Sequence, residues 1–397
     1  MSRMPMCELL AWHAERDPDR VAVVCGDDVI TRAELDRASN RMAREYASMG
    51  AKPGELISIA LPNSIEFYVA AFAALKLGAT PMPISHRLPE FEREAILELA
   101  RPAILVGADS TAARRCVPSG HLPAVDVDDG PLPTVVAESW KAMTSGGSTG
   151  RPKIIVANER AEADPDAPPY TGMTPDGVQL VPGPLYHQGP FIFSMGGLFT
   201  GQTVVLMPRF DAAEALALIE RHRVDWVYFV PTMVHRIMRL PADVRDAHDL
   251  SSLRVAFSTG GPFPAWLKEE WIRWLGPHRV IEAYGGTEKT GGTMIRGHES
   301  LERPGSVGRV SPGASIRLLD DDGRDVPPGE IGEIYFRPAG GPGSTYRYIG
   351  AEAKRRGEWE TLGDLGYVDE DGYLYLVDRR TDMIVSGGEN VYPAEVE

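Results

Sequence analysis

The residues with the clearest chemical potential lie in one ten-residue stretch, Thr144-Ser145-Gly146-Gly147-Ser148-Thr149-Gly150-Arg151-Pro152-Lys153. Its glycines free the backbone to turn several N–H groups toward one point, and its hydroxyls and two cations surround that point. This chemistry suits a polyphosphate, although a surface turn with incidental basic residues is the alternative. The P-loop of nucleoside triphosphatases is disfavoured, because it needs Gly followed directly by Lys at a helix start, and here an apolar strand follows Lys153.

A second segment, Tyr284-Gly285-Gly286-Thr287-Glu288, follows a predicted strand. Its aromatic face can stack on a nucleobase, its glycines allow close backbone approach, and Thr287 can bond a phosphate oxygen. Glu288 offers the hard oxygen ligand that Mg²⁺ prefers. Taken alone, the segment could equally be a hairpin turn.

A third segment, Leu362-Gly363-Asp364, is followed by Asp378-Arg379-Arg380-Thr381-Asp382. An isolated Gly-Asp pair is far more often a turn than a ligand site. Together and in this order, however, the three segments resemble the adenylate-forming superfamily of acyl- and aryl-CoA synthetases, firefly luciferase and nonribosomal peptide adenylation domains. The resemblance covers essentially the whole chain, and it is strongest to stand-alone acyl-CoA ligases of the bile-acid type and of platensimycin-type diterpenoid pathways.

The resemblance implies ATP-dependent activation of a carboxylic acid to an acyl-adenylate, with Mg²⁺, and thioester formation with coenzyme A. It assigns the phosphates to Lys153 and the loop before it, the Mg²⁺ ion to Glu288, the α-phosphate to Thr287, and both ribose hydroxyls to Asp364. His187 matches an acyl-site gate, and Thr381 and Asp382 match a hinge. For His187, the alternative is a structural histidine. The remaining nucleotide contacts that it implies are Ser145, Gly147, Ser148, Thr149, Gly150, Gly260, Gly261, Pro262, Glu282, Ala283, Tyr284, Gly285 and Arg379.

The acyl pocket is predicted to be wide and mostly apolar. Glycines replace side chains along its likely floor, which favours a bulky polycyclic or terpenoid acid. The alternative is that these glycines serve tight turns and that other side chains fill the space. The predicted lining is His187, Phe191, Phe193, Val230, Gly260, Gly285, Gly286 and Gly291.

The elements that must position these residues alternate between strand and helix up to about residue 303, and then become short strands divided by turns. This pattern predicts an α/β fold with two mainly parallel, helix-flanked sheets in αβαβα layers and a small antiparallel β-barrel. We expect an N-terminal subdomain over 1–170, a second α/β subdomain over 171–303, a β-rich subdomain over 304–380, and a hinge with the start of a further domain over 381–397.

Because the family's mobile C-terminal domain is missing from this sequence, we expect a truncated form that is weakly active or inactive. The competing hypotheses are an adenylate-binding module without turnover and an aryl- or amino-acid adenylation domain that loads a carrier protein. No acidic residue stands out to bind the ammonium group of an amino acid.

Composition excludes several classes of protein. The 397 residues carry 41 basic and 56 acidic side chains, a net charge of −15, which disfavours nucleic-acid and anionic-membrane partners. No apolar stretch has the length of a signal peptide or a membrane span. Three widely spaced cysteines indicate reduced, buried thiols and a cytoplasmic location.

Overall fold

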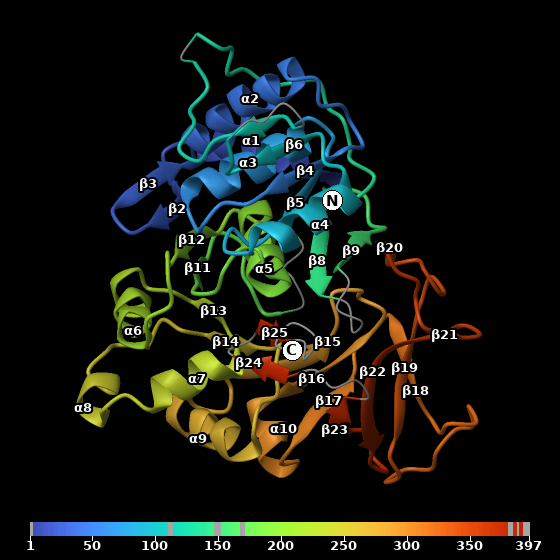
Figure 1. Cartoon of the computed structure of the whole chain (residues 1–397). Helices are drawn as coiled ribbons and strands as arrows, with labels where there is room; N and C mark the ends of the chain where they lie inside the picture. Colours follow the sequence, from blue (N-terminus) through green and yellow to red (C-terminus); the bar gives the residue numbers. More distant parts are fainter. Residues whose placement is uncertain are drawn as a thin grey trace.

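Parallel strands and covering helices build the N-terminal part of the chain (Figure 1). In the computed structural model, the described residues are 3–109, 114–124, 126–146, 152–166, 171–379, 384–386 and 389–391. A four-stranded parallel sheet has the order β5-β4-β6-β7. Its strands are β4 (Leu56–Ile59), β5 (Thr80–Pro83), β6 (Ile104–Val106) and β7 (Cys116–Val117).

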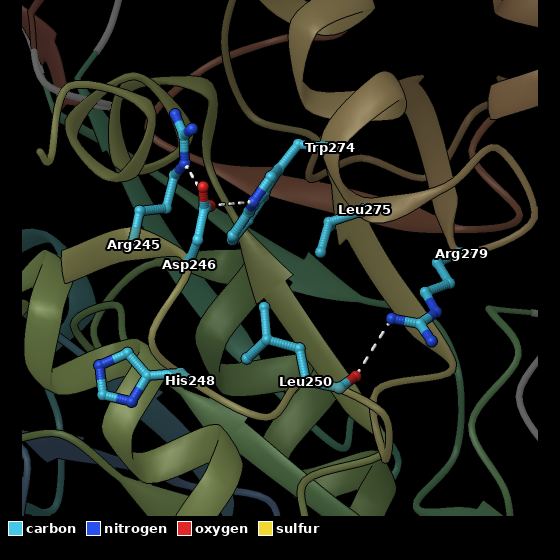
Figure 2. A pocket seen from close by; sticks show the side chains of 7 residues that line it. All are labelled: Arg245, Asp246, His248, Leu250, Trp274, Leu275 and Arg279. Carbon is cyan, nitrogen blue, oxygen red and sulfur yellow. Dashed lines mark hydrogen bonds and ion pairs between the residues drawn. The ribbon is translucent and has the colours of Figure 1, made fainter. Parts of the chain in front are cut away.

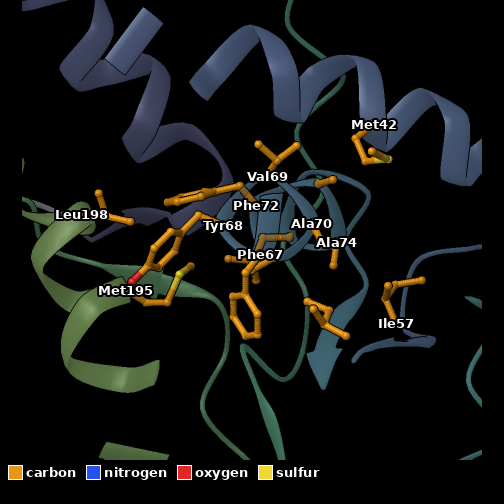
Figure 3. Close-up of a cluster of buried hydrophobic side chains, with 14 of the residues drawn as sticks. Met42, Ile57, Phe67, Tyr68, Val69, Ala70, Phe72, Ala74, Met195 and Leu198 are labelled. Carbon is orange, nitrogen blue, oxygen red and sulfur yellow. The ribbon is translucent and has the colours of Figure 1, made fainter. Parts of the chain in front are cut away.

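Helix α3 (Ile65–Lys76) is buried on almost every side and lies between layers, as its apolar circumference predicts. Figure 3 shows Tyr68 and Phe72 of this helix extending toward Met195 and Leu198 of a helix far along the chain. The helices are α1 (Met6–Arg16), α2 (Arg32–Ser48), α4 (Glu90–Ala100), α5 (Gln188–Phe199), α6 (Ala212–Arg221), α7 (Pro231–Met238), α8 (Ala242–Arg245), α9 (Ala265–Leu275) and α10 (Gly297–Glu302).

A larger sheet contains fourteen strands and begins with a hairpin from the N-terminal part of the chain. The neighbours β2, β12, β11, β13, β14 and β15 are parallel. Residues 21–31 therefore lie in the sheet of the predicted 171–303 subdomain. The strands up to β16 are β2 (Val21–Cys25), β3 (Asp28–Thr31), β11 (Val178–Val181), β12 (Thr203–Leu206), β13 (Trp226–Phe229), β14 (Val255–Ser258), β15 (Val280–Gly285) and β16 (Gly292–Arg296).

The same sheet continues into the antiparallel strands predicted after residue 304, with the order β16-β17-β23-β22-β19-β18. These strands are β17 (Ser306–Val310), β18 (Ala314–Leu319), β19 (Gly332–Pro338), β21 (Arg355–Arg356), β22 (Trp359–Val368) and β23 (Leu374–Arg379). The α/β architecture with parallel sheets is therefore confirmed.

A three-stranded antiparallel sheet contains the segments on either side of the predicted phosphate loop, in the order β20-β9-β8. It consists of β8 (Ala142–Gly146), β9 (Pro152–Ala157) and β20 (Tyr346–Ile349). The remaining short strands are β1 (Met4–Pro5), β10 (Glu162–Ala163), β24 (Ile384–Ser386) and β25 (Glu389–Val391).

Local sequence signals are confirmed where the structure describes them. Thr31 and Glu34 form the predicted capping box at the start of α2, and Asp211 caps α6. Cys7, Cys25 and Cys116 are buried and form no disulfide among the described residues. Within the described residues, no helix is long and apolar enough to cross a membrane.

Candidate functional site

The predicted site residues gather at one edge of the large sheet. Val230, Gly260 and Tyr284 lie at or just after the carboxyl ends of β13, β14 and β15. These three strands are parallel neighbours, so the segments that follow them are adjacent. In open α/β sheets, ligands bind outside the carboxyl ends of the strands.

Lys153 meets Glu288 across this edge. The Lys153 Nζ lies 3.3 Å from Glu288 Oε1 and 3.0 Å from the hydroxyl of Tyr348, which donates to the same carboxylate oxygen at 2.6 Å. Glu288 is buried. Burial and the neighbouring Glu288 raise the pKa of Tyr348, so its hydroxyl stays a donor.

Strand pairing explains how residues 135 or more positions apart come together. Ser145 pairs with Lys153 in the β8–β9 hairpin, and Tyr348 on β20 pairs with Ile155 of β9. The predicted phosphate-loop residues Gly147, Ser148, Thr149 and Gly150 lie outside the described residues, as does the side chain of Ser145. The segment after the loop is a strand, as expected for a loop unlike that of the P-loop enzymes.

Tyr284 and Asp364, from the second and third motifs, are also brought together. The Tyr284 hydroxyl donates to Asp364 Oδ2 at 2.6 Å, and Asp364 is buried. Arg379 pairs with Asp364 in the backbone register of β22 and β23. The side chain of Arg379 and the predicted hinge residues Thr381 and Asp382 are outside the described part.

Glu282 has a partner that the sequence did not indicate. Lys268 of α9 donates to Glu282 Oε2 at 2.5 Å and to the carbonyl of Ser306 at 2.8 Å. Burial raises the pKa of Glu282, and Lys268 opposes this shift. That the other carboxylate oxygen of Glu282, Oε1, contacts adenine stays a prediction.

The two predicted phenylalanines of the acyl pocket point to different parts of the molecule. Phe193 packs against Trp226, Tyr228 and Phe257 with ring centroids 5.1–5.4 Å apart, in a cluster that Val230 and Ala283 also contact. Phe191 is fully buried in the core of α3 and stacks on Trp140. Because residues two apart on a helix face different directions, Phe191 does not form one wall with Phe193, which corrects that prediction.

At two glycine positions, neighbouring side chains fill the space that was predicted to be open, so that prediction is wrong there. A Cβ at Gly286 would collide with Leu362 and lie 2.9 Å from Glu288 Oε2, and one at Gly291 would collide with Phe336. At Gly260, whose φ is +90°, a Cβ would lie 2.9 Å from the Tyr228 hydroxyl. Neighbouring side chains therefore fill this space, and the glycines permit close approach instead of leaving a wide floor.

The other predicted site residues occupy the turns around this edge. His187 precedes α5, is half-buried, and lies 4.6 Å from the Tyr186 ring. Thr287 lies in the turn after β15, which Lys289 closes with a φ of +54°. Gly285 ends β15 opposite Gly292, and Gly261 and Pro262 follow β14.

The described side chains could supply only some of the ligands that a Mg²⁺ ion needs. No group of three or more His, Cys, Asp or Glu side chains in the described residues could hold a metal. Mg²⁺ is commonly held by one or two carboxylates together with substrate phosphates, and the Glu288 carboxylate beside the phosphate-loop lysine matches that pattern.

Four residues that hydrogen-bond to a predicted site residue or to its neighbour in the chain were not found from the sequence: Lys141, Tyr228, Lys268 and Tyr348. Each acts through a long-range contact between separate elements. Two tyrosines alternating in the stretch Tyr346-Arg347-Tyr348 were a signal for a strand, but its partner could not be read from the sequence.

Two surface cavities lie outside this set of residues. One, of about 260 Å³, lies beside α8 and α9, and Figure 2 shows its charged groups already paired: Asp246 accepts from Arg245 and Trp274. The second, of about 270 Å³, adjoins the segment that leads to His187 and includes Arg87, Arg209 and Arg236 in its lining.

Comparison with known proteins shows the family to which the chain belongs. Residues 10–348 match the family of AMP-binding enzymes. The chain belongs to this family. It is 35% identical to a feruloyl-CoA synthase of Amycolatopsis sp over 405 residues, which is 97% of this chain and 80% of that protein.

Solved structures of AMP-binding relatives have the same fold. A double mutant of o-succinylbenzoate CoA synthetase from Bacillus subtilis, bound with a product analogue, matches with a TM-score of 0.84 and 28% identity over 100% of this chain and 83% of that one. The same synthetase in complex with ATP and magnesium ion matches with a TM-score of 0.79 and 27% identity over 100% and 84%. These matches support the AMP-binding family and do not single out the bile-acid or diterpenoid type.

Proposed function

We propose that the chain activates a carboxylic acid with ATP and that coenzyme A then receives the acyl group. In the first step, a carboxylate oxygen forms a bond to the α-phosphorus while the bond between the α- and β-phosphates breaks and pyrophosphate leaves. The carboxylate needs no covalent help from the enzyme, so the protein's task is to position the reactants and neutralise charge.

The observation that carries this proposal is the meeting of Lys153 and Glu288, 3.3 Å apart at the root of the phosphate-loop hairpin. Lys153 would stabilise the leaving pyrophosphate, and Glu288 would hold a Mg²⁺ ion, which supplies positive charge to the phosphates when bound. Tyr348 fixes the Glu288 carboxylate by donating to it. Asp364 would accept the ribose hydroxyls, with Tyr284 beside it.

For the acid, we propose an aromatic body in place of the polycyclic or terpenoid one that the glycines suggested. The half-buried Phe193 lies among three aromatic rings next to Val230, a surface suited to a flat ring. Feruloyl and o-succinylbenzoyl groups, which the relatives' names contain, both have a benzene ring.

Coenzyme A is proposed as the acceptor because of the cavity beside the His187 segment. Arg87, Arg209 and Arg236 border it, and the described contacts place none of the three in an ion pair. The guanidinium group of arginine binds phosphate well. Coenzyme A carries several phosphate groups, whereas the prosthetic arm of an acyl carrier protein carries one. A carrier-protein acceptor is the alternative.

The test is acid-dependent pyrophosphate release with a panel of aromatic, polycyclic, fatty and amino acids, followed by detection of the acyl-CoA. We expect release with aromatic acids that is weak, as the sequence predicts, but measurable, and a loss of about 100-fold or more in Lys153→Ala, since removing one charge-stabilising donor costs this much. Lys52→Ala, at an exposed lysine away from this edge, should match the wild type. No release with any acid would contradict the proposal.

A further inference from the structure

Three lysines are buried in the described part of the chain, and they differ in what neutralises them: Lys76, Lys141 and Lys268. Lys76 lies 2.5 Å from Asp36 and Lys268 lies 2.5 Å from Glu282. Lys141 is only 1% exposed, yet its single described hydrogen-bond partner is the neutral side-chain oxygen of Gln188, at 2.8 Å. Burying an ammonium group without a bonded counter-charge is costly.

The surroundings of Lys141 explain why it is strained electrostatically. Trp140 lies beside it on its own segment, with the ring centroid 5.7 Å from the ammonium, and Gln188 faces it from α5. Burial and the positive charge of Lys289 lower the pKa of Lys141 to about 7, while Glu159 and Glu288 act in the opposite direction. Glu159 is itself engaged by Lys289 at 3.0 Å.

The position of Lys141 links the two halves of the site. It immediately precedes β8, which leads to the phosphate loop, and its partner Gln188 directly follows His187, the predicted acyl gate. Lys153, on the other arm of the hairpin, already serves the phosphate side with Glu288 and Tyr348. Lys141 is therefore a second cation whose described hydrogen bond goes to the segment that carries the predicted gate and not to Glu288.

We propose that Lys141 binds the reacting carboxylate of the acid substrate, whose negative charge supplies the counter-ion that the buried ammonium lacks in the free protein. This inference rests on the proposed acid activation. Lys141 and Gln188 together would hold the carboxylate end while the aromatic body lies toward Phe193. The protein retains a destabilising buried lysine here because the ligand, and not a side chain, completes its environment.

The experiment is ATP–pyrophosphate exchange with ferulic acid as the probe, with separate KM values for acid and ATP, alongside thermal melting. In Lys141→Met we expect the KM for ferulic acid to rise tenfold or more, the KM for ATP to stay within twofold, and the melting temperature to be unchanged or higher. Lys141→Gln, which keeps a donor for Gln188 but no charge, should show the same acid defect.

The matched control is Lys76→Met, at a buried lysine in the α2–α3 contact. It should lower the melting temperature, because it leaves the Asp36 carboxylate without its counter-charge. Both KM values should stay unchanged. A folded Lys141→Met or Lys141→Gln protein with the wild-type KM for ferulic acid would overturn the inference, as would an equal rise in the KM for ATP. No exchange by the wild type with ferulic acid or any acid of the panel would instead overturn the proposed function.

Discussion

The proposed nucleotide side and the proposed acyl side of the site are held together by different forces. On the nucleotide side, hydrogen bonds join Lys153, Glu288 and Tyr348, and a further one joins Tyr284 to Asp364. On the acyl side, Phe193 and Val230 are positioned by apolar packing. Hydrogen bonds require particular partners at fixed distances, whereas packing accepts many side chains of similar volume. The residues of the proposed nucleotide side can therefore be recognised from short sequence motifs, whereas those of the proposed acyl side cannot.

The largest expected effect separates the two phenylalanines. Phe191→Ala should destabilise the protein by about 3–5 kcal/mol, because it empties a fully buried position between Phe67 and Trp140. The Phe191→Ala variant should keep the wild-type preference among acid substrates. Denaturant unfolding and the acid panel measure the two effects.

The comparison variant is Phe193→Ala, which removes a half-buried ring at the proposed acyl surface. We expect a smaller loss of stability and a change in acid preference. If Phe191→Ala shifts acid preference while Phe193→Ala does not, the division of the two residues between core and pocket is wrong.

The next effect concerns the nucleotide side. Asp364→Ala should weaken AMP binding by tenfold or more, about 1.4 kcal/mol, because a buried carboxylate that accepts two hydroxyl protons is lost. Titration calorimetry measures it, with the exposed Asp322→Ala as the matched control from the same β-rich part. Unchanged affinity in Asp364→Ala would remove Asp364 from the ribose site.

The smallest effect is a pH dependence on the acyl side. The pKa of Lys141 is about 7 in the free protein, and only its protonated form attracts a carboxylate. As pH rises through this value the cation is lost, so the KM for the acid should rise roughly fivefold between pH 7 and pH 8. The same profile in Lys141→Met should be flat over this interval. A rise of equal size in Lys141→Met would assign the titration to another group, such as His187.

The parts of the molecule that the sequence predicted share a local cause. The Thr31–Glu34 capping box, the buried α3 and the strand after Lys153 each depend on residues a few positions apart. Tyr284 and Asp364 were found through motifs, and the structure brings their side chains into contact. Their roles toward a nucleotide stay predictions.

What escaped prediction depends on contacts between distant elements. Tyr348 reaches Glu288 because β20 pairs with β9, and Lys141, just before β8, bonds to Gln188 at the start of α5, 47 positions later. The error at Gly286 has the same origin, since Leu362 that fills its space belongs to a strand 76 positions later. A missing side chain in a sequence gives no information on which neighbour occupies the space.

The most direct measurement is a crystal structure of the chain with a non-hydrolysable analogue of feruloyl-adenylate. The account predicts ribose hydroxyls within about 3 Å of the Asp364 carboxylate, the acyl carbonyl end beside Lys141 and Gln188, and the aromatic ring against Phe193. An analogue bound away from the carboxyl ends of β13, β14 and β15, with no contact to Asp364, would contradict it.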